Sequence, residues 1–207
     1  ARNLLSSTTT LRLGLSLSDS SKRYTRISTE ALRAAVAACD EPNVPFVTPR
    51  EVKKRCYVVI AGDRGLAGGY NANIFKAFAA HSEGMPYCVL PLGRKAIEHF
   101  NRHGAESLLK DSYRVEGTSV GACYKLAKLL TDGYEAEQFD ELWIVYTSFQ
   151  NMMSQEVRVN RLLPIERTEK DEARAPVGTV YELPASETLS LVVPDFLAGR
   201  LYSALCD

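Results

Sequence analysis

The sequence has no excess of charge of either sign. Its 207 residues hold 25 lysines and arginines against 25 aspartates and glutamates. A balanced chain produces no overall field that attracts nucleic acid or anionic lipid, so such contacts would need a local patch. The chain also lacks an apolar run near the roughly eighteen residues that cross a bilayer. We therefore expect an ordinary globular protein that does not itself span a membrane.

Paired cysteines are absent as well. The five cysteines (Cys39, Cys56, Cys88, Cys123 and Cys206) are scattered and include no C-x-x-C pair. This spacing indicates neither a disulfide framework nor a zinc site, and it fits a reducing compartment. We interpret Cys56 and Cys88 as small core residues and Cys123 as a packing residue of a helix.

No catalytic motif is recognisable. There is no G-x-S-x-G elbow, and the pair His99 and His103 lacks the glutamate of H-E-x-x-H and a third ligand nearby. We expect both histidines on a solvated helix face and His81 as a complement to a helix dipole. The acid pairs 140–141 and 171–172 have the pattern of exposed surface charge. The sequence thus predicts no catalytic residue, metal site or cofactor.

Buried strands and amphipathic helices follow one another along the chain. Continuous apolar runs at 56–61, 86–92 and 141–149 are typical of strands in a parallel sheet, and helices are expected at 22–38, 71–81, 94–103 and 118–132. The apolar residues at helical spacing are Ile27, Ala31, Ala34 and Ala35 in the first helix and Ile74, Phe75 and Phe78 in the second. In the last helix Val120, Tyr124, Ala127 and Leu130, or neighbouring apolar residues, are expected to face inward.

The pattern changes after residue 155. Apolar and polar residues alternate over 156–165, as in an antiparallel strand with one wet face. A charged loop at 166–176, a possible strand at 177–183 and a helix at 186–206, interrupted near Pro194, complete the chain. The predicted class is α/β, with a Rossmann-like mixed sheet flanked by helices.

The stretch GDRGLAGGYN at 62–71 suggests a phosphate-binding loop, but it matches neither G-x-G-x-x-G nor the P-loop pattern. In the favoured interpretation the loop is structural. Gly65, Gly68 and Gly69 then permit positive φ in a tight strand-to-helix turn, Asp63 and Arg64 pair with neighbouring groups, and Asn71 caps the next helix. The alternative is a nucleotide- or phosphate-ligand-binding α/β protein that uses this loop.

Basic residues gather at two places. Lys53, Lys54 and Arg55 precede the first strand, and Arg158 and Arg161 lie on the alternating one. A plain surface charge pattern is one interpretation, and a docking face for an acidic protein partner is the other. We take Arg158 and Arg161 as the candidate partner interface.

The segment GDRGLAGGYNANIFK at 62–76 resembles the signature of the gamma subunit of the F-type ATP synthase. TPREVK, LGRKA, VYTSFQNMMSQE, RLLPI and VVPDFLAGRLYSAL resemble family segments in the same order, so the resemblance covers roughly residues 21–207. It implies a non-catalytic rotor subunit of the central stalk, which couples rotation of the membrane ring to ATP synthesis or hydrolysis on partner subunits.

The implied partners are the epsilon subunit (delta in mitochondria), the c-subunit ring and, through a shaft, the alpha and beta subunits. The chain would then be peripheral on the energy-coupling membrane, on the bacterial cytoplasmic side or the mitochondrial matrix side. Residues 48–207 correspond to the globular foot domain and 21–47 to the tail of the first helix and a linker.

The family's two long coiled-coil motifs and the dithiol insertion of chloroplast members are missing from the sequence. Because the coiled-coil motifs are missing, we interpret the chain as a fragment, an engineered foot domain or a divergent subunit with its arms elsewhere. Because the dithiol insertion is missing, we expect no redox switching. Residues 1–20 match no family motif and are expected to form a poorly ordered or helical leader, with an organelle transit peptide as the alternative.

Overall fold

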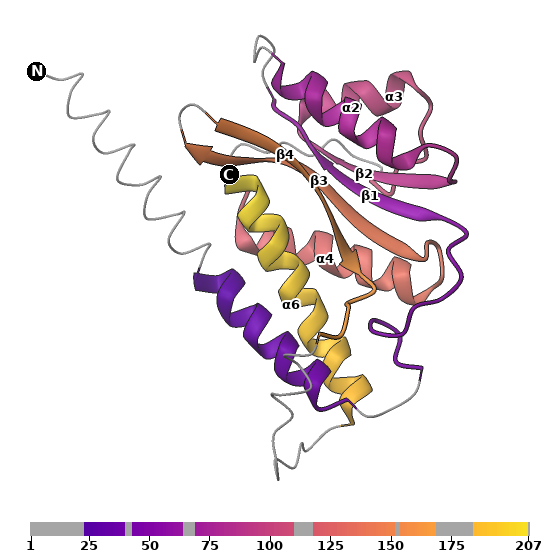
Figure 1. Ribbon diagram of the computed structural model, residues 1–207, viewed down its shortest axis with the longest axis vertical. Helices are drawn as coiled ribbons and strands as arrows, with labels where there is room; N and C mark the ends of the chain where they lie inside the picture. Colours follow the sequence, from indigo (N-terminus) through magenta and orange to yellow (C-terminus); the bar gives the residue numbers. More distant parts are fainter. Residues whose placement is uncertain are drawn as a thin grey trace, which may run out of the picture.

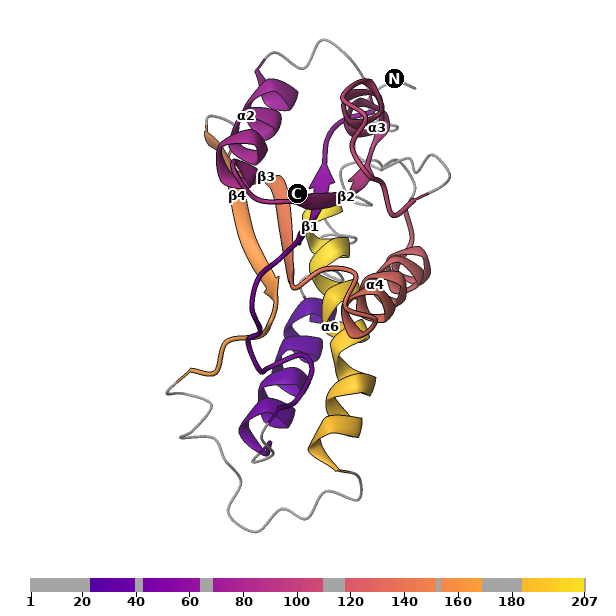
Figure 2. The same ribbon diagram turned by 90° about the vertical axis from the view of Figure 1, so that its right-hand side faces the viewer.

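A four-stranded mixed sheet forms the middle of three layers. The computed structural model describes residues 23–39, 43–63, 69–109, 118–151, 154–168 and 184–206. Helices α2 (Tyr70–Ser82) and α3 (Arg94–Arg102) cover one face of the sheet, as Figure 1 shows. Helices α4 (Val120–Glu135) and α6 (Ala185–Cys206) lie on the other face together with an N-terminal helix at 23–37 (Figure 2). The predicted α/β class is confirmed.

The strand order is β2-β1-β3-β4. The strands are β1 (Arg55–Ile60), β2 (Tyr87–Leu92), β3 (Glu141–Asn151) and β4 (Ser154–Leu163). Strand β1 pairs in parallel with both β2 and β3, whereas β4 pairs antiparallel with β3. The apolar runs and the alternating segment therefore took the orientations that their patterns predict.

Two apolar clusters lie on opposite faces of the sheet because successive strand residues point to opposite sides. Cys56, Val58 and Ile60 of β1 join the larger cluster, to which α4, α6 and the N-terminal helix contribute. Tyr57 and Val59 join the smaller cluster under α2 and α3. Burial on both faces explains why β1 reads as a continuous apolar run.

The N-terminal helix at 23–37 lies alongside α6 in both views (Figures 1 and 2). Its buried positions are Ser28, Leu32, Ala35 and Val36. The predicted inward face was wrong for Ile27, Ala31 and Ala34, which are exposed. In this alanine-rich helix two faces fit the apolar period, and the one that carries Leu32 and Val36 buries more apolar surface.

Helix α4 buries Ala127 and Leu130 as predicted, together with neighbouring apolar residues. Ser119 caps it by accepting a hydrogen bond from the Ala122 amide at 3.2 Å, and its buried side includes Cys123, Leu126, Ala127 and Leu130. Tyr124 is 41% exposed, so its assignment to the core was wrong. An aromatic ring with a polar hydroxyl is readily left at the rim of a packed surface.

Helix α6 continues through Pro194, although an interruption was predicted there. Proline removes one backbone donor, but Val193 and Leu197 beside it are fully buried, and this packing holds the helix together. By length and composition alone, Ser186–Cys206 is apolar enough to cross a membrane, contrary to the sequence expectation. Half of that window is buried inside the protein, as in a core helix.

Several predictions fall outside the described residues. They concern the leader at 1–20, the strand at 177–183, most of the loop at 166–176, and the acid pair 171–172.

Candidate functional site

Residues of the signature segment at 62–76 connect three elements of the fold. Gly62, which follows β1, donates its amide hydrogen to Asn71 Oδ1 in the first turn of α2 at 3.0 Å. Asp63 Oδ1 accepts from the Arg94 amide, the first of α3, at 2.8 Å. The Gly62 carbonyl accepts from the Lys95 amide at 3.1 Å. The segment thus ties β1 to the N-terminal ends of both helices on that face.

These contacts use groups that a phosphate site would need. A helix N-terminus binds anions through its free amides and its partial positive charge. At α3 a carboxylate of the chain itself, that of Asp63, already accepts from the Arg94 amide. Asp63 thus pairs with a neighbouring group, as expected, and its hydrogen bond links the end of β1 to α3.

Two details of the signature prediction were wrong. Asn71 is not the N-cap of α2, because that position is Gly69 and no side chain caps it. Gly69 has a φ of −77°, so it needs no glycine-specific conformation there. Arg64, Gly65 and Gly68 lie outside the described residues.

Asp140 and Glu141 were expected to be exposed, and they are buried. Asp140 accepts from Arg50 Nε at 2.7 Å and from the Lys53 and Lys54 amides at 2.8 and 3.0 Å. Burial by itself would raise the pKa of Asp140, but the two amides and the guanidinium outweigh it and hold that pKa below its ordinary value. The carboxylate is therefore ionised and fixed.

Arg50 completes this first ion pair. Its guanidinium donates to the carbonyls of Tyr134 and Phe139 and lies over the Tyr134 ring, 4.4 Å from the centroid. Arg50 thereby connects the segment before β1 to the end of α4 and to the start of β3. These segments precede the parallel strands β1 and β3, so they meet at the end of the sheet where both strands begin. The signature segment leaves β1 at the opposite end.

Glu141 forms a second cluster on β3. It accepts from Arg55 Nε at 2.8 Å and from Trp143 Nε1 at 3.0 Å, and it forms an ion pair with Arg161 at 3.4 Å. The guanidinium carbons of Arg55 and Arg161 lie 5.8 and 6.0 Å from the centroid of the Trp143 ring. Charges from β1, β3 and β4 are therefore held together across the sheet.

The two arginines of the candidate partner interface differ in their surroundings. Arg161 also pairs with Glu166, and 28% of its side chain is exposed. The Arg158 side chain is 42% exposed and forms an ion pair only with the exposed Glu156 among the described residues, at 3.3 Å. Its Nε is buried without a hydrogen-bond partner in the same part of the chain. Arg158 is thus the freer of the two.

The other basic cluster is largely engaged within the chain. Lys54 Nζ pairs with Glu106 at 2.8 Å, and this hydrogen bond raises the pKa of Lys54. Arg55 belongs to the Glu141 cluster. Only the Lys53 side chain is left mostly in solvent, 76% exposed, with a long contact to Glu51 at 3.9 Å.

The histidines and cysteines show no metal centre. Within the described ranges no group of three or more His, Cys, Asp or Glu side chains is arranged to hold a metal ion. His81 bonds through Nδ1 with the Tyr57 hydroxyl at 2.9 Å, and burial, aided by the charge of Arg55, lowers the pKa of His81. A neutral His81 does not complement the helix dipole as predicted. Burial raises the pKa of Cys123 to about 11, as expected for a packing thiol.

Sequence reasoning missed the two ion-pair clusters because their members lie far apart in the chain. Arg50 and Asp140 are separated by 90 residues. One local signal was available, since Asp140 and Glu141 stand directly between the apolar residues Phe139 and Leu142. Acids at that position are partly drawn into the core and need partners.

Comparison with known proteins identifies relatives of the chain. A family model described as ATP synthase matches residues 7–207, and so begins within the segment 1–20 that matched no family motif. The ATP synthase gamma chain of Alkaliphilus metalliredigens is 32% identical over 213 residues, covering 100% of this chain and 73% of the relative. That of Brevibacillus brevis is 31% identical over 202 residues, covering 95% and 70%.

A solved structure shares the fold. It is the central stalk and c-ring of the mitochondrial ATP synthase of Tetrahymena thermophila, with a TM-score of 0.59 and 15% identity over 94% of this chain and 91% of that one. The family match, the curated relatives and this shared fold all cover nearly the whole sequence. The chain therefore belongs to the ATP synthase gamma-chain family.

Proposed function

We propose that this chain is the central-stalk rotor subunit of an F-type proton-translocating ATP synthase and that it is not itself catalytic. In this role it couples rotation of the membrane ring to ATP synthesis or hydrolysis on partner subunits. The observation that carries the proposal is the family match over residues 7–207. The signature segment supports it, because Asp63 and Asn71 are engaged in hydrogen bonds that join β1, α2 and α3.

The proposed partners are the epsilon subunit, named delta in mitochondria, the c-subunit ring, and the alpha and beta subunits. A rotor needs a body that does not deform under torque. Close packing on both faces of a mixed sheet supplies this stiffness. We place the subunit peripherally on the energy-coupling membrane, on the bacterial cytoplasmic side or the mitochondrial matrix side.

We assign residues 48–207 to the foot domain and 21–47 to the tail of the first helix with a linker. The linker contributes to the core, since Val44, Phe46 and Val47 are buried in the larger apolar cluster. The Ile165 amide also donates to the Phe46 carbonyl at 2.8 Å. In this proposal the first helix and the foot move as one body.

Sedimentation of the purified chain with and without the epsilon-type subunit of the same source tests the proposal. We expect a stable one-to-one complex and no ATP hydrolysis by the chain alone. A folded chain that forms no complex would contradict the stalk role. In that case saturable nucleotide binding that is lost in Asp63→Asn, with folding retained, would favour the alternative in which the loop at 62–71 binds a phosphate ligand.

A further inference from the structure

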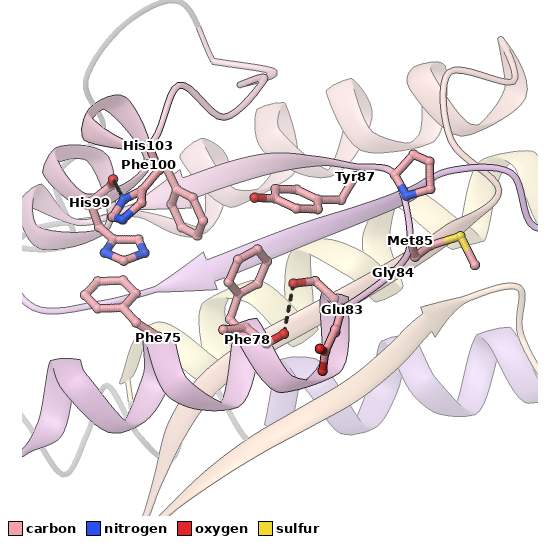
Figure 3. A pocket seen from close by; sticks show the side chains of 12 residues that line it. Phe75, Phe78, Glu83, Gly84, Met85, Tyr87, His99, Phe100 and His103 are labelled. Carbon is pink, nitrogen blue, oxygen red and sulfur yellow. Dashed lines mark hydrogen bonds between the residues drawn. The ribbon is translucent and has the colours of Figure 1, made fainter.

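A half-open pocket lies between α2, α3 and the start of β2, away from the signature segment. Its volume is about 660 Å³, within the usual range of small-molecule sites, and Figure 3 shows its lining. Phe78, Phe100 and Tyr87 form an aromatic floor in which Phe78 meets the other two rings edge to face, at 4.9 and 5.2 Å between centroids. The signature residues do not line this pocket.

A stacked pair of rings closes one end of the pocket. His99 lies flat on Phe75, with centroids 3.9 Å apart and planes 4° apart. Burial, followed by the positive charges of His103 and Arg102, lowers the pKa of His99. His99 is thus neutral near neutral pH and can accept a hydrogen bond.

His103 lies beside His99 at the same end of the pocket. Its Nδ1 lies 2.7 Å from the His99 carbonyl oxygen, as the dashed line in Figure 3 marks. A carbonyl only accepts, so Nδ1 of His103 is the donor of this hydrogen bond. This hydrogen bond to the helix backbone holds the His103 ring in place beside the pocket.

The opposite end of the pocket carries acceptors too. Ser82 Oγ donates to the Ala79 carbonyl at 3.4 Å, which leaves the hydroxyl lone pairs for a ligand. Glu83, exposed at the end of α2, takes part in none of the ion pairs formed among the described residues. The C-terminal end of a helix adds a partial negative charge. Aromatic faces thus lie between groups that accept hydrogen bonds.

We propose that this pocket binds an organic ammonium ion with an apolar body. An ammonium group supplies only donors, and it is attracted both to the Glu83 carboxylate and to aromatic faces. The apolar body packs against Phe78, Tyr87 and Met85. An organic anion would meet the Glu83 charge and the helix end, while a neutral hydrocarbon would leave the acceptors without partners.

Three probes of one shape and different charge test the proposal: phenethylammonium, phenethyl alcohol and phenylacetate. Each is titrated into the full chain while the ring resonances of His99, His103 and Tyr87 are followed by nuclear magnetic resonance. We expect saturable binding of phenethylammonium, about tenfold tighter than that of the alcohol, because a charge-assisted hydrogen bond is added. Phenylacetate should bind most weakly.

Variants then separate charge from shape. Glu83→Gln should remove most of the preference for the ammonium probe and leave the affinity for the alcohol unchanged. Glu98→Gln is the matched control, because the Glu98 carboxylate pairs with Arg94 and Lys95 and does not line the pocket. Equal affinity for ammonium and alcohol, an unchanged preference in Glu83→Gln, or no binding of any probe would overturn the proposal.

Discussion

Asp140 does more for the fold than its position beside another acid suggests. Its two oxygens accept from the Arg50 side chain and from two consecutive backbone amides that lead into β1. Among the described residues Asp140 is the acceptor of both amides, and donors left without a partner inside a protein are costly. One carboxylate thus fixes the entry to the central strand and neutralises a partly buried guanidinium.

Asp140→Asn should lower the free energy of unfolding by about 2 kcal/mol near neutral pH, because a charged acceptor is lost and Arg50 keeps its charge. Urea denaturation followed by circular dichroism measures this change. Asp132→Asn is the matched control. Asp132 is 57% exposed and pairs with Lys128 on the surface of α4, so less than about 0.5 kcal/mol should be lost there.

Comparing the stability of wild type and Asp140→Asn at several pH values gives a second test of this prediction. The folded pKa of Asp140 lies below its ordinary value, so its ionised form stabilises the fold above the unfolded pKa. This stabilisation is lost as pH falls through the folded value. The difference between wild type and Asp140→Asn should therefore be constant above about pH 5 and shrink below about pH 4. A difference that does not change with pH would show that the charge of Asp140 is not its source.

At the scale of helices, α6 and the N-terminal helix are in close contact at Gly199. The Thr25 hydroxyl donates to the Gly199 carbonyl at 2.9 Å. A Cβ built on Gly199 would lie 2.8 Å from Ser28 Oγ and 3.3 Å from the Thr25 backbone. The absence of a side chain at Gly199 therefore sets the distance between the two helices.

Gly199→Ala should destabilise the protein by about 1–3 kcal/mol, although alanine is the better helix former, because the backbone of the partner helix has to move. Gly121→Ala in α4 is the control with the opposite sign. Among the described residues its Cβ would meet only Ser119 Oγ, at an ordinary contact distance of 3.9 Å, and the substitution should stabilise by about 0.5 kcal/mol. Thermal unfolding of both variants measures the contrast. Equal effects would mean that the two helices do not pack as described.

The same elements show what sequence could predict. The strands of the sheet were recognisable because burial on both faces of β1 and β3 leaves continuous apolar runs, and one wet face leaves alternation in β4. Where more than one apolar stripe runs along a helix, periodicity does not determine which face is buried. Ile27 and Tyr124 were assigned to the core for this reason. Asp140 and Glu141 could not be matched with Arg50 and Arg55 because only tertiary structure brings them together.

At the scale of the whole molecule, the buried ion-pair clusters and the exposed charges of β4 have different roles. The Glu141 cluster spans β1, β3 and β4 inside one layer, so it stiffens the sheet that would carry torque. Strand β4 lies at the edge of that sheet, where a partner could be reached. Of the two arginines proposed for docking, Arg161 belongs to the cluster and Arg158 faces solvent to a greater degree.

Charge reversal should therefore separate these roles. Arg161→Glu places a like charge beside Glu141, whose side chain is only 9% exposed, and should lower the free energy of unfolding by about 3 kcal/mol. Arg158→Glu should change stability by less than about 0.5 kcal/mol and weaken the complex with the epsilon-type subunit. Denaturation and sedimentation of both variants measure the two effects. If Arg158→Glu binds that subunit as tightly as wild type, Arg158 lies outside this interface, and the exposed Lys53 of the other basic cluster becomes the next candidate.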